Sequence, residues 1–265
     1  MPSQFSALGF QVATGEDLAS LASSVADKAD KIPAKGGQYL RWAPPSGEQL
    51  WLQVKPNGDA MGMNPHFAGE STIRIALEAR VARDTHTPLD GTFLAWANPP
   101  TGAHAGGDYP FAFDCPDAGM FGELAVPAVV DAQIAAFAQE VSVFDTEARY
   151  AASQAAQGMA FASRSFIPSG LISPDGHPVN PPESHALFVG GVVKAEERRN
   201  TVTGRPFWWA LVETVGGTFD VVIDPALLPE PPQAGNVLSG WFWLSGRLRS
   251  GAEDKPGWFG RLMRR

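Results

Sequence analysis

A period-two alternation runs from Ser71 to Arg83, and it constrains the fold more than any other feature of the sequence. Every second residue is apolar, in the series Ile73, Ile75, Leu77, Ala79 and Val81. Side chains of a β-strand point alternately to two faces, so this pattern predicts a strand with one buried and one wetter face. We expect Ile75 and Leu77 in the core and Arg74 on the wetter face.

The segments around this strand predict an antiparallel sheet with helices. Thr14 with Asp17 three residues later is typical of a helix N-terminus, and apolar residues at three-and-four spacing follow as far as Pro33. Residues 38–43 and 49–55 flank a Pro-Pro-Ser-Gly turn and predict a hairpin. Residues 5–13 are expected to form a first strand.

Two further segments complete the first half of the chain. The alanine-rich residues 146–157 predict a second helix, capped by Asp145. Residues 133–144 fit either a helix or a strand, and their Val-Ser-Val-Phe ending favours a strand. The first half is therefore expected to be an α+β domain, an antiparallel sheet with two helices, over residues 1–165.

A stretch rich in proline, glycine and serine, 166–185, is typical of a linker or a long ordered loop. We place a domain boundary there. Residues 186–250 predict four to five bent strands with glycines at the bends. This order of elements resembles an OB-fold, a five-stranded Greek-key barrel. The resemblance implies a small C-terminal OB-like β-barrel. A basic aromatic tail follows it at 251–265.

The net charge and the cysteine content limit which cellular compartments and which classes of partner we expect. The net charge is −8, and the single cysteine, Cys115, allows no intrachain disulfide. We see neither a secretory leader nor an apolar run of membrane-spanning length, so we expect a cytoplasmic protein. Arginine outnumbers lysine and alanine is abundant, which suggests a GC-rich bacterial genome. An acidic chain repels phosphate backbones, so nucleic acid is an unfavourable partner.

Aromatic residues are the strongest candidates for binding. The two triplets 207–209 and 241–243 contain Trp208, Trp241 and Trp243, and the tail adds Trp258 and Phe259 beside Arg261. Tryptophan and arginine dominate the energetics of protein interfaces. The competing interpretation is packing inside the barrel and against the first domain, because alternate residues of a strand must point inward.

The case for catalysis is weaker. His66, Glu70 and Glu78 are the candidate metal ligands, although residues 61–70 have the composition of a loop. The order of elements over residues 5–83 is similar to the repeat unit of glyoxalase-type proteins, and that resemblance implies a metal held by histidine and glutamate on a concave sheet. Cys115 follows Asp114, which disfavours an activated thiolate. The common nucleophile and phosphate-binding motifs are absent from the sequence.

These observations favour a non-catalytic protein that binds another protein as an adaptor or scaffold, with no cofactor. A small-molecule or metal-dependent enzyme is the first alternative, and single-stranded nucleic-acid binding by the barrel is the second. The basic tail adds a possible peripheral contact with a partner or an anionic membrane surface.

Overall fold

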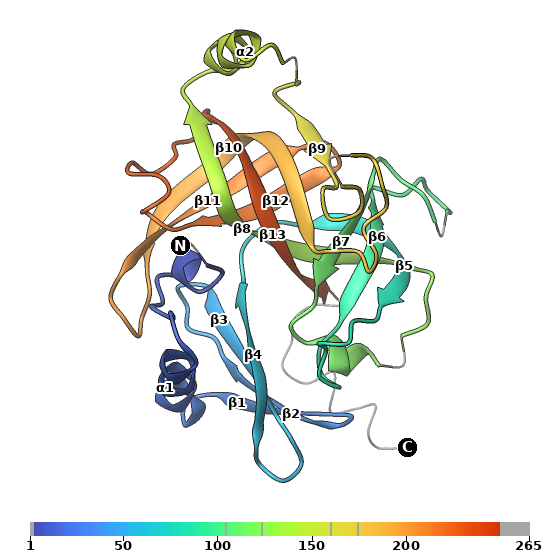
Figure 1. The fold of residues 1–265 in the computed structure, drawn as a ribbon, viewed down its shortest axis with the longest axis vertical. Helices are drawn as coiled ribbons and strands as arrows, with labels where there is room; N and C mark the ends of the chain where they lie inside the picture. Colours follow the sequence, from blue (N-terminus) through green and yellow to red (C-terminus); the bar gives the residue numbers. More distant parts are fainter. Residues whose placement is uncertain (1–2, 104, 123, 160, 174, 250–265) are drawn as a thin grey trace.

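The computed structural model of the protein describes residues 3–249 apart from residues 104, 123, 160 and 174. This described part forms two α-helices, two short 3-10 helices, a four-stranded antiparallel sheet and a nine-stranded mixed sheet. The protein is therefore mainly β. In Figure 1 the smaller sheet lies below a ring of strands formed by the larger sheet. No helix of the described part is long and apolar enough to cross a membrane.

The N-terminal sheet has its strands in chain order, each antiparallel to the next: β1 (Asp30–Ala34), β2 (Gly37–Trp42), β3 (Glu48–Val54) and β4 (Ala60–Phe67). Helix α1 (Gly15–Ala26) precedes it and begins with the predicted capping box between Thr14 and Asp17. The helix ends at Ala26, earlier than expected. Pro33 lies instead in β1, at the edge of the sheet, where a missing N–H is tolerated.

The nine-stranded sheet contains β5 (Ile73–Val81), β6 (Thr92–Ala97), β7 (Pro110–Asp114), β8 (Ala128–Phe144), β9 (Ser165–Ile167), β10 (His185–Arg199), β11 (Pro206–Thr214), β12 (Gly217–Ile223) and β13 (Val237–Arg249). It closes on itself because β8 pairs antiparallel with β13 and parallel with β12. On the other side, β10 pairs with both β11 and β13. The circuit β8–β13–β10–β11–β12 is therefore a closed ring of strands.

The predicted strand character of 133–144 is confirmed by β8. This strand belongs to the first half of the chain, yet it pairs with β12 and β13 from the second. Backbone hydrogen bonds also tie residues 166–185 together, for example from Val179 N to Leu171 O and from Glu183 N to Gly170 O. Whether the parts before and after this segment fold separately stays a prediction.

The alternation from Ser71 to Arg83 appears in β5 as predicted. Ile75 and Leu77 are fully buried, and Arg74 is exposed. Ala76 is buried as well, so the second face of β5 is not exposed along its whole length. Ile73, Ile75 and Leu77 of β5 join the largest apolar cluster, which is shared among the strands of the nine-stranded sheet.

A second apolar cluster joins the ring to the N-terminal sheet. Phe207 and Trp209 of β11 pack there against Phe67 of β4, with ring centroids 6.0 and 6.2 Å from Phe67. Trp208 and Phe242 belong to the largest cluster instead. Neighbouring aromatic residues of each triplet therefore point to opposite faces of their strand, as the packing interpretation expected.

Three local expectations are wrong. Residues 5–13 contain the 3-10 helix η1 (Ser6–Leu8) rather than a strand, because Ser3 and Ser6 bond each other's backbone and Gly9 turns the chain at φ +77°. Residues 61–70, expected to be a loop, largely form β4. Helix α2 (Glu147–Ala156) is capped by Thr146 rather than by Asp145. The short helix η2 (Ala118–Phe121) completes the described elements.

Candidate functional site

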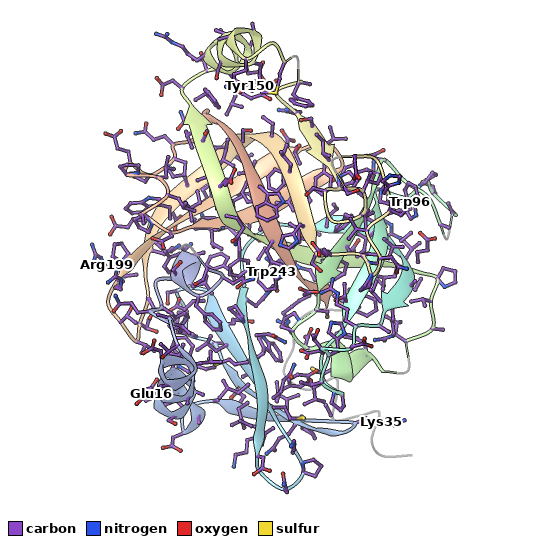
Figure 2. All side chains as sticks on the ribbon, viewed as in Figure 1. Glu16, Lys35, Trp96, Tyr150, Arg199 and Trp243 are labelled. Carbon is purple, nitrogen blue, oxygen red and sulfur yellow. The ribbon has the colours of Figure 1, made fainter. Side chains whose placement is uncertain are left out.

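A polar cleft lies where the ring meets the N-terminal sheet. It consists of two cavities, of about 200 and 360 Å³, which share Arg83, Asp114 and Trp243 in their walls. Figure 2 labels Trp243 at this junction, between the ring and β4. Volumes of this size suit a side chain or a small ligand, because sites for drug-sized molecules occupy roughly 300–1,000 Å³.

Six separate segments build the cleft, and one of them is the N-terminal segment, which contributes Gln4. Asn64 comes from β4, Arg83 to Asp90 from the loop after β5, and Asp114 from the end of β7. Glu183 to His185 enter from the proline-rich segment, and Trp243 from β13. No short sequence motif spans such a site, since its members are brought together only by the pairing of distant strands.

Asp114 is the hub of the cleft. Its Oδ1 accepts hydrogen bonds from Thr92 Oγ1 at 2.5 Å and Ser184 Oγ at 2.7 Å, and Arg83 Nη1 lies 3.3 Å away. Its Oδ2 accepts from Trp243 Nε1 at 2.7 Å. Four donors therefore fix the position of this carboxylate.

Asp90 forms a second hub at the other side of the cleft. Its Oδ1 accepts from Gln53 Nε2 at 2.6 Å and Asn64 Nδ2 at 2.9 Å, and its Oδ2 accepts from Thr87 N. Burial alone would raise the pKa of Asp90. The hydrogen bonds outweigh this effect and hold the pKa below its ordinary value. Asp90 therefore carries a full negative charge into the cleft at neutral pH.

Cys115 is buried in the wall of the cleft and is not activated as a nucleophile. Its Sγ donates to Asp117 Oδ1 at 3.2 Å, and Asp117 Oδ2 pairs with Arg247 Nε at 2.9 Å. Burial raises the pKa of the Cys115 thiol well above its ordinary value, and the Asp117 carboxylate raises it further. Because the thiolate is the nucleophilic form, Cys115 does not suit nucleophilic catalysis.

A chain of buried polar groups runs from the cleft wall into the protein. Ser245 Oγ lies 2.9 Å from His66 Nδ1, His66 Nε2 lies 2.8 Å from Gln133 Oε1, and Gln133 Nε2 donates to Asp220 Oδ2 at 2.7 Å. The amide oxygen can only accept, so Nε2 of His66 carries the proton and Nδ1 accepts from Ser245. Asp220 also accepts from Trp209 Nε1 and from the backbone of Glu70 and Ser71.

This chain has the connectivity of a nucleophile, a base and an orienting group, but its surroundings favour a structural role. His66 and Asp220 are fully buried, and Ser245 is almost so. Burial, together with the nearby Arg247 charge, lowers the pKa of His66 to about 3. A base with so low a pKa takes up a serine proton poorly at neutral pH. The chain joins β4 to the ring.

The lowered pKa of His66 makes stability dependent on pH. The folded protein binds this proton only near pH 3, whereas the unfolded chain binds it near the ordinary value of 6.5. The contribution of His66 is therefore complete above pH 6.5 and is lost as the pH falls from 6.5 towards 3. We expect the free energy of unfolding to drop by about 2 kcal/mol from this group between pH 7 and pH 5, measured by urea denaturation.

Two variants isolate this effect. His66→Gln removes the titrating ring, so its free energy of unfolding should fall less between pH 7 and pH 5 than that of the wild type. His177→Gln removes an exposed histidine and should keep the full pH dependence. An equal fall in all three proteins would show that His66 is not the group responsible.

The three candidate metal ligands each contact a different partner. Glu70 pairs with Lys194 Nζ at 2.7 Å, and Glu78 accepts from Trp96 Nε1 at 2.6 Å, while His66 is enclosed in the buried chain. Within residues 3–249, apart from the four undescribed positions, no group of three or more histidine, cysteine, aspartate or glutamate side chains could hold a metal ion.

The candidate protein-binding residues also differ in their surroundings. Trp208 is buried and donates from Nε1 to Leu228 O at 2.8 Å. Trp243 is nearly buried and packs against Phe137, with the ring centroids 4.9 Å apart. It also lines the cleft. Trp241, on the same face of β13 as Trp243, is 36% exposed. The tail residues Trp258, Phe259 and Arg261 lie outside the described residues.

Trp241 belongs to an exposed apolar row that sequence reasoning missed in part. Leu187 of β10 pairs directly with Trp241 of β13 on one side and with Ile167 of β9 on the other. Residues directly opposite one another point to the same face. We name Ile167, Leu187 and Trp241 the Trp241 surface. His185 stacks on Trp241 at 4.8 Å, and Trp241 Nε1 donates to Ser169 Oγ at 3.2 Å.

Comparisons with known proteins gave no match, whether the chain was set against models of protein families, curated proteins or solved structures.

Proposed function

We propose that this chain is a non-catalytic protein that binds a partner protein through the Trp241 surface. The observation that carries the proposal is the in-register row of Ile167, Leu187 and Trp241, whose outer members are 37% and 36% exposed. An exposed tryptophan within an apolar patch is typical of a protein interface. The stack with His185 and the bond to Ser169 limit the motion of Trp241, which lowers the entropic cost of binding.

Chemistry elsewhere supports binding over catalysis. The thiol of Cys115 has a raised pKa, and the imidazole of His66 is buried with a pKa of about 3. Neither is suited to activate a substrate. The single buried thiol also agrees with our proposal of a cytoplasmic location, in a reducing compartment.

We further propose that the ring is an OB-like barrel whose fifth strand, β8, precedes the other four in the chain. The closed pairing of β8 with β12 and β13 supports this proposal. Protein binding is favoured over nucleic-acid binding because basic groups along β10 are paired with acidic ones: Lys194 with Glu196, Arg198 with Glu196, and Arg199 with Glu197. Paired cations release fewer counterions from a phosphate backbone.

Trp241→Ala should abolish partner binding. The chain is affinity-purified from the cells that express it naturally, and co-purified proteins are quantified by mass spectrometry. We expect at least one protein recovered with the wild type to fall about tenfold or more with Trp241→Ala, since a central interface tryptophan contributes more than 1.4 kcal/mol.

Val202→Ala is the matched control, because Val202 is also exposed but lies in the turn between β10 and β11. This variant should recover the same proteins as the wild type. Melting temperatures of both variants verify that the fold is intact. If Trp241→Ala and Val202→Ala recover identical sets of proteins, the Trp241 surface is not the interface.

A further inference from the structure

We infer that the polar cleft beside the Trp241 surface receives a basic side chain, an arginine or a lysine, from the bound partner. This inference rests on the proposed function and adds the chemistry of the partner: an apolar segment that covers Trp241, next to a cationic residue that enters the cleft.

The first support is the charge of the cleft. Among the described residues, its walls contain three carboxylates, Asp90, Asp114 and Glu183, and one cation, Arg83. With histidines counted as neutral, the walls carry a formal charge of −2. A pocket with walls of low dielectric focuses such a charge and favours a positive ligand.

The second support is the way in which the one cation is used. Arg83 Nη1 pairs with Asp114 at 3.3 Å, and Nη2 donates to Pro182 O at 2.6 Å. This arginine holds the proline-rich segment against the cleft and neutralises Asp114. The charges of Asp90 and Glu183 remain, one in each cavity, with only neutral donors on Asp90 and the His185 ring near Glu183.

The third support is continuity between the two surfaces. His185 stacks on Trp241 and also lines the cleft with Glu183 and Trp243. Burial lowers the pKa of His185 below its ordinary value, so the ring adds no positive charge there at neutral pH. A partner segment lying across Trp241 can therefore place its next side chain over His185 and into an acidic opening.

Binding of a model cation tests this inference without the partner. The probe is Nα-acetyl-L-arginine amide, titrated into the ¹⁵N-labelled full chain, and the signal is the indole N–H resonance of Trp243. That N–H donates to Asp114 inside the cleft. The resonance is assigned by its disappearance in Trp243→Phe, with nuclear Overhauser contacts as a second route if that variant folds poorly. We expect the resonance to shift to saturation as the probe is added. The affinity of the probe should fall as salt is added.

Three controls sharpen the result. Nα-acetyl-L-citrulline amide has the same shape without the charge, and it should bind at least fivefold more weakly. Glu183→Gln should weaken binding of the arginine probe by about twofold to fivefold, within the range measured for exposed ion pairs. Asp175→Asn removes an exposed carboxylate of the same segment that does not line the cleft, and it should leave binding unchanged.

The inference is overturned if the arginine probe gives no saturable shift at tens of millimolar, if citrulline binds equally well, or if Nα-acetyl-L-glutamate amide binds better. Failure of the probe to bind would not count against the Trp241 surface. The cleft is tested by Glu183→Gln, whereas the surface is tested by Trp241→Ala. A partner that depends on Trp241 but not on Glu183 would retain the proposed function and reject the basic side chain.

Discussion

Leu77→Asp is expected to abolish soluble expression. Leu77 is fully buried in the largest apolar cluster, between β6 and β8. An aspartate there would bury an unpaired charge, at a cost comparable with the whole free energy of folding, which is roughly 5–15 kcal/mol for a domain. The measurement is the soluble fraction after expression, followed by circular dichroism of any soluble protein.

Arg74→Ala is the control on the same strand. Arg74 is exposed and pairs with Asp131 at 3.3 Å on the surface. Its loss should change the free energy of unfolding by no more than about 0.5 kcal/mol. Equal damage from the two substitutions would mean that the buried and exposed faces of β5 have been assigned wrongly.

Asp220→Ala is expected to produce the second-largest effect. Asp220 is fully buried and accepts four hydrogen bonds, from Gln133, Trp209 and the backbone of Glu70 and Ser71. Removing the carboxylate leaves four donors without their acceptor, and three of them, on Ser71, Gln133 and Trp209, are buried. We expect a loss of more than about 3 kcal/mol in the free energy of unfolding by urea.

Gly69→Ala should be destabilising through the same group, because a Cβ at residue 69 would collide with the Asp220 carboxylate. Glu230→Ala, which removes an exposed carboxylate, should change stability by no more than about 0.5 kcal/mol. If Asp220→Ala unfolds at the same urea concentration as Glu230→Ala, the buried chain does not join the ring to the N-terminal sheet.

The elements that could be predicted from the sequence are those specified locally. The alternation in β5 and the capping box of α1 are properties of neighbouring residues. β4 was missed because Gly62 and Pro65 give it a loop-like composition. It forms because β3 supplies the hydrogen-bonding partner and because His66 and Phe67 are buried against the ring. Long-range contacts of this kind leave no local signature.

The sequence predicted a barrel over residues 186–250, but the part of β8 in closing the ring and the existence of the cleft could not be predicted, for the same reason. β8 is recognisable as a strand, but its partners β12 and β13 lie far along the chain. Asp114 stood in the sequence only as a neighbour of Cys115. Its role depends on Thr92, Ser184 and Trp243, which are distant in sequence. The aromatic triplets were candidates for binding in the sequence, but only the structure distinguishes exposed Trp241 from buried Trp208.

The most direct test of the central claim is photo-crosslinking from the Trp241 surface in living cells. A benzophenone amino acid replaces Ile167 in one protein and Val202 in another, both of which are exposed. We expect light to produce a crosslinked adduct with one specific protein from position 167 and not from position 202. Trp241→Ala should remove this adduct. An adduct from position 202 alone, or the same adduct from both positions, would contradict a binding surface centred on Trp241.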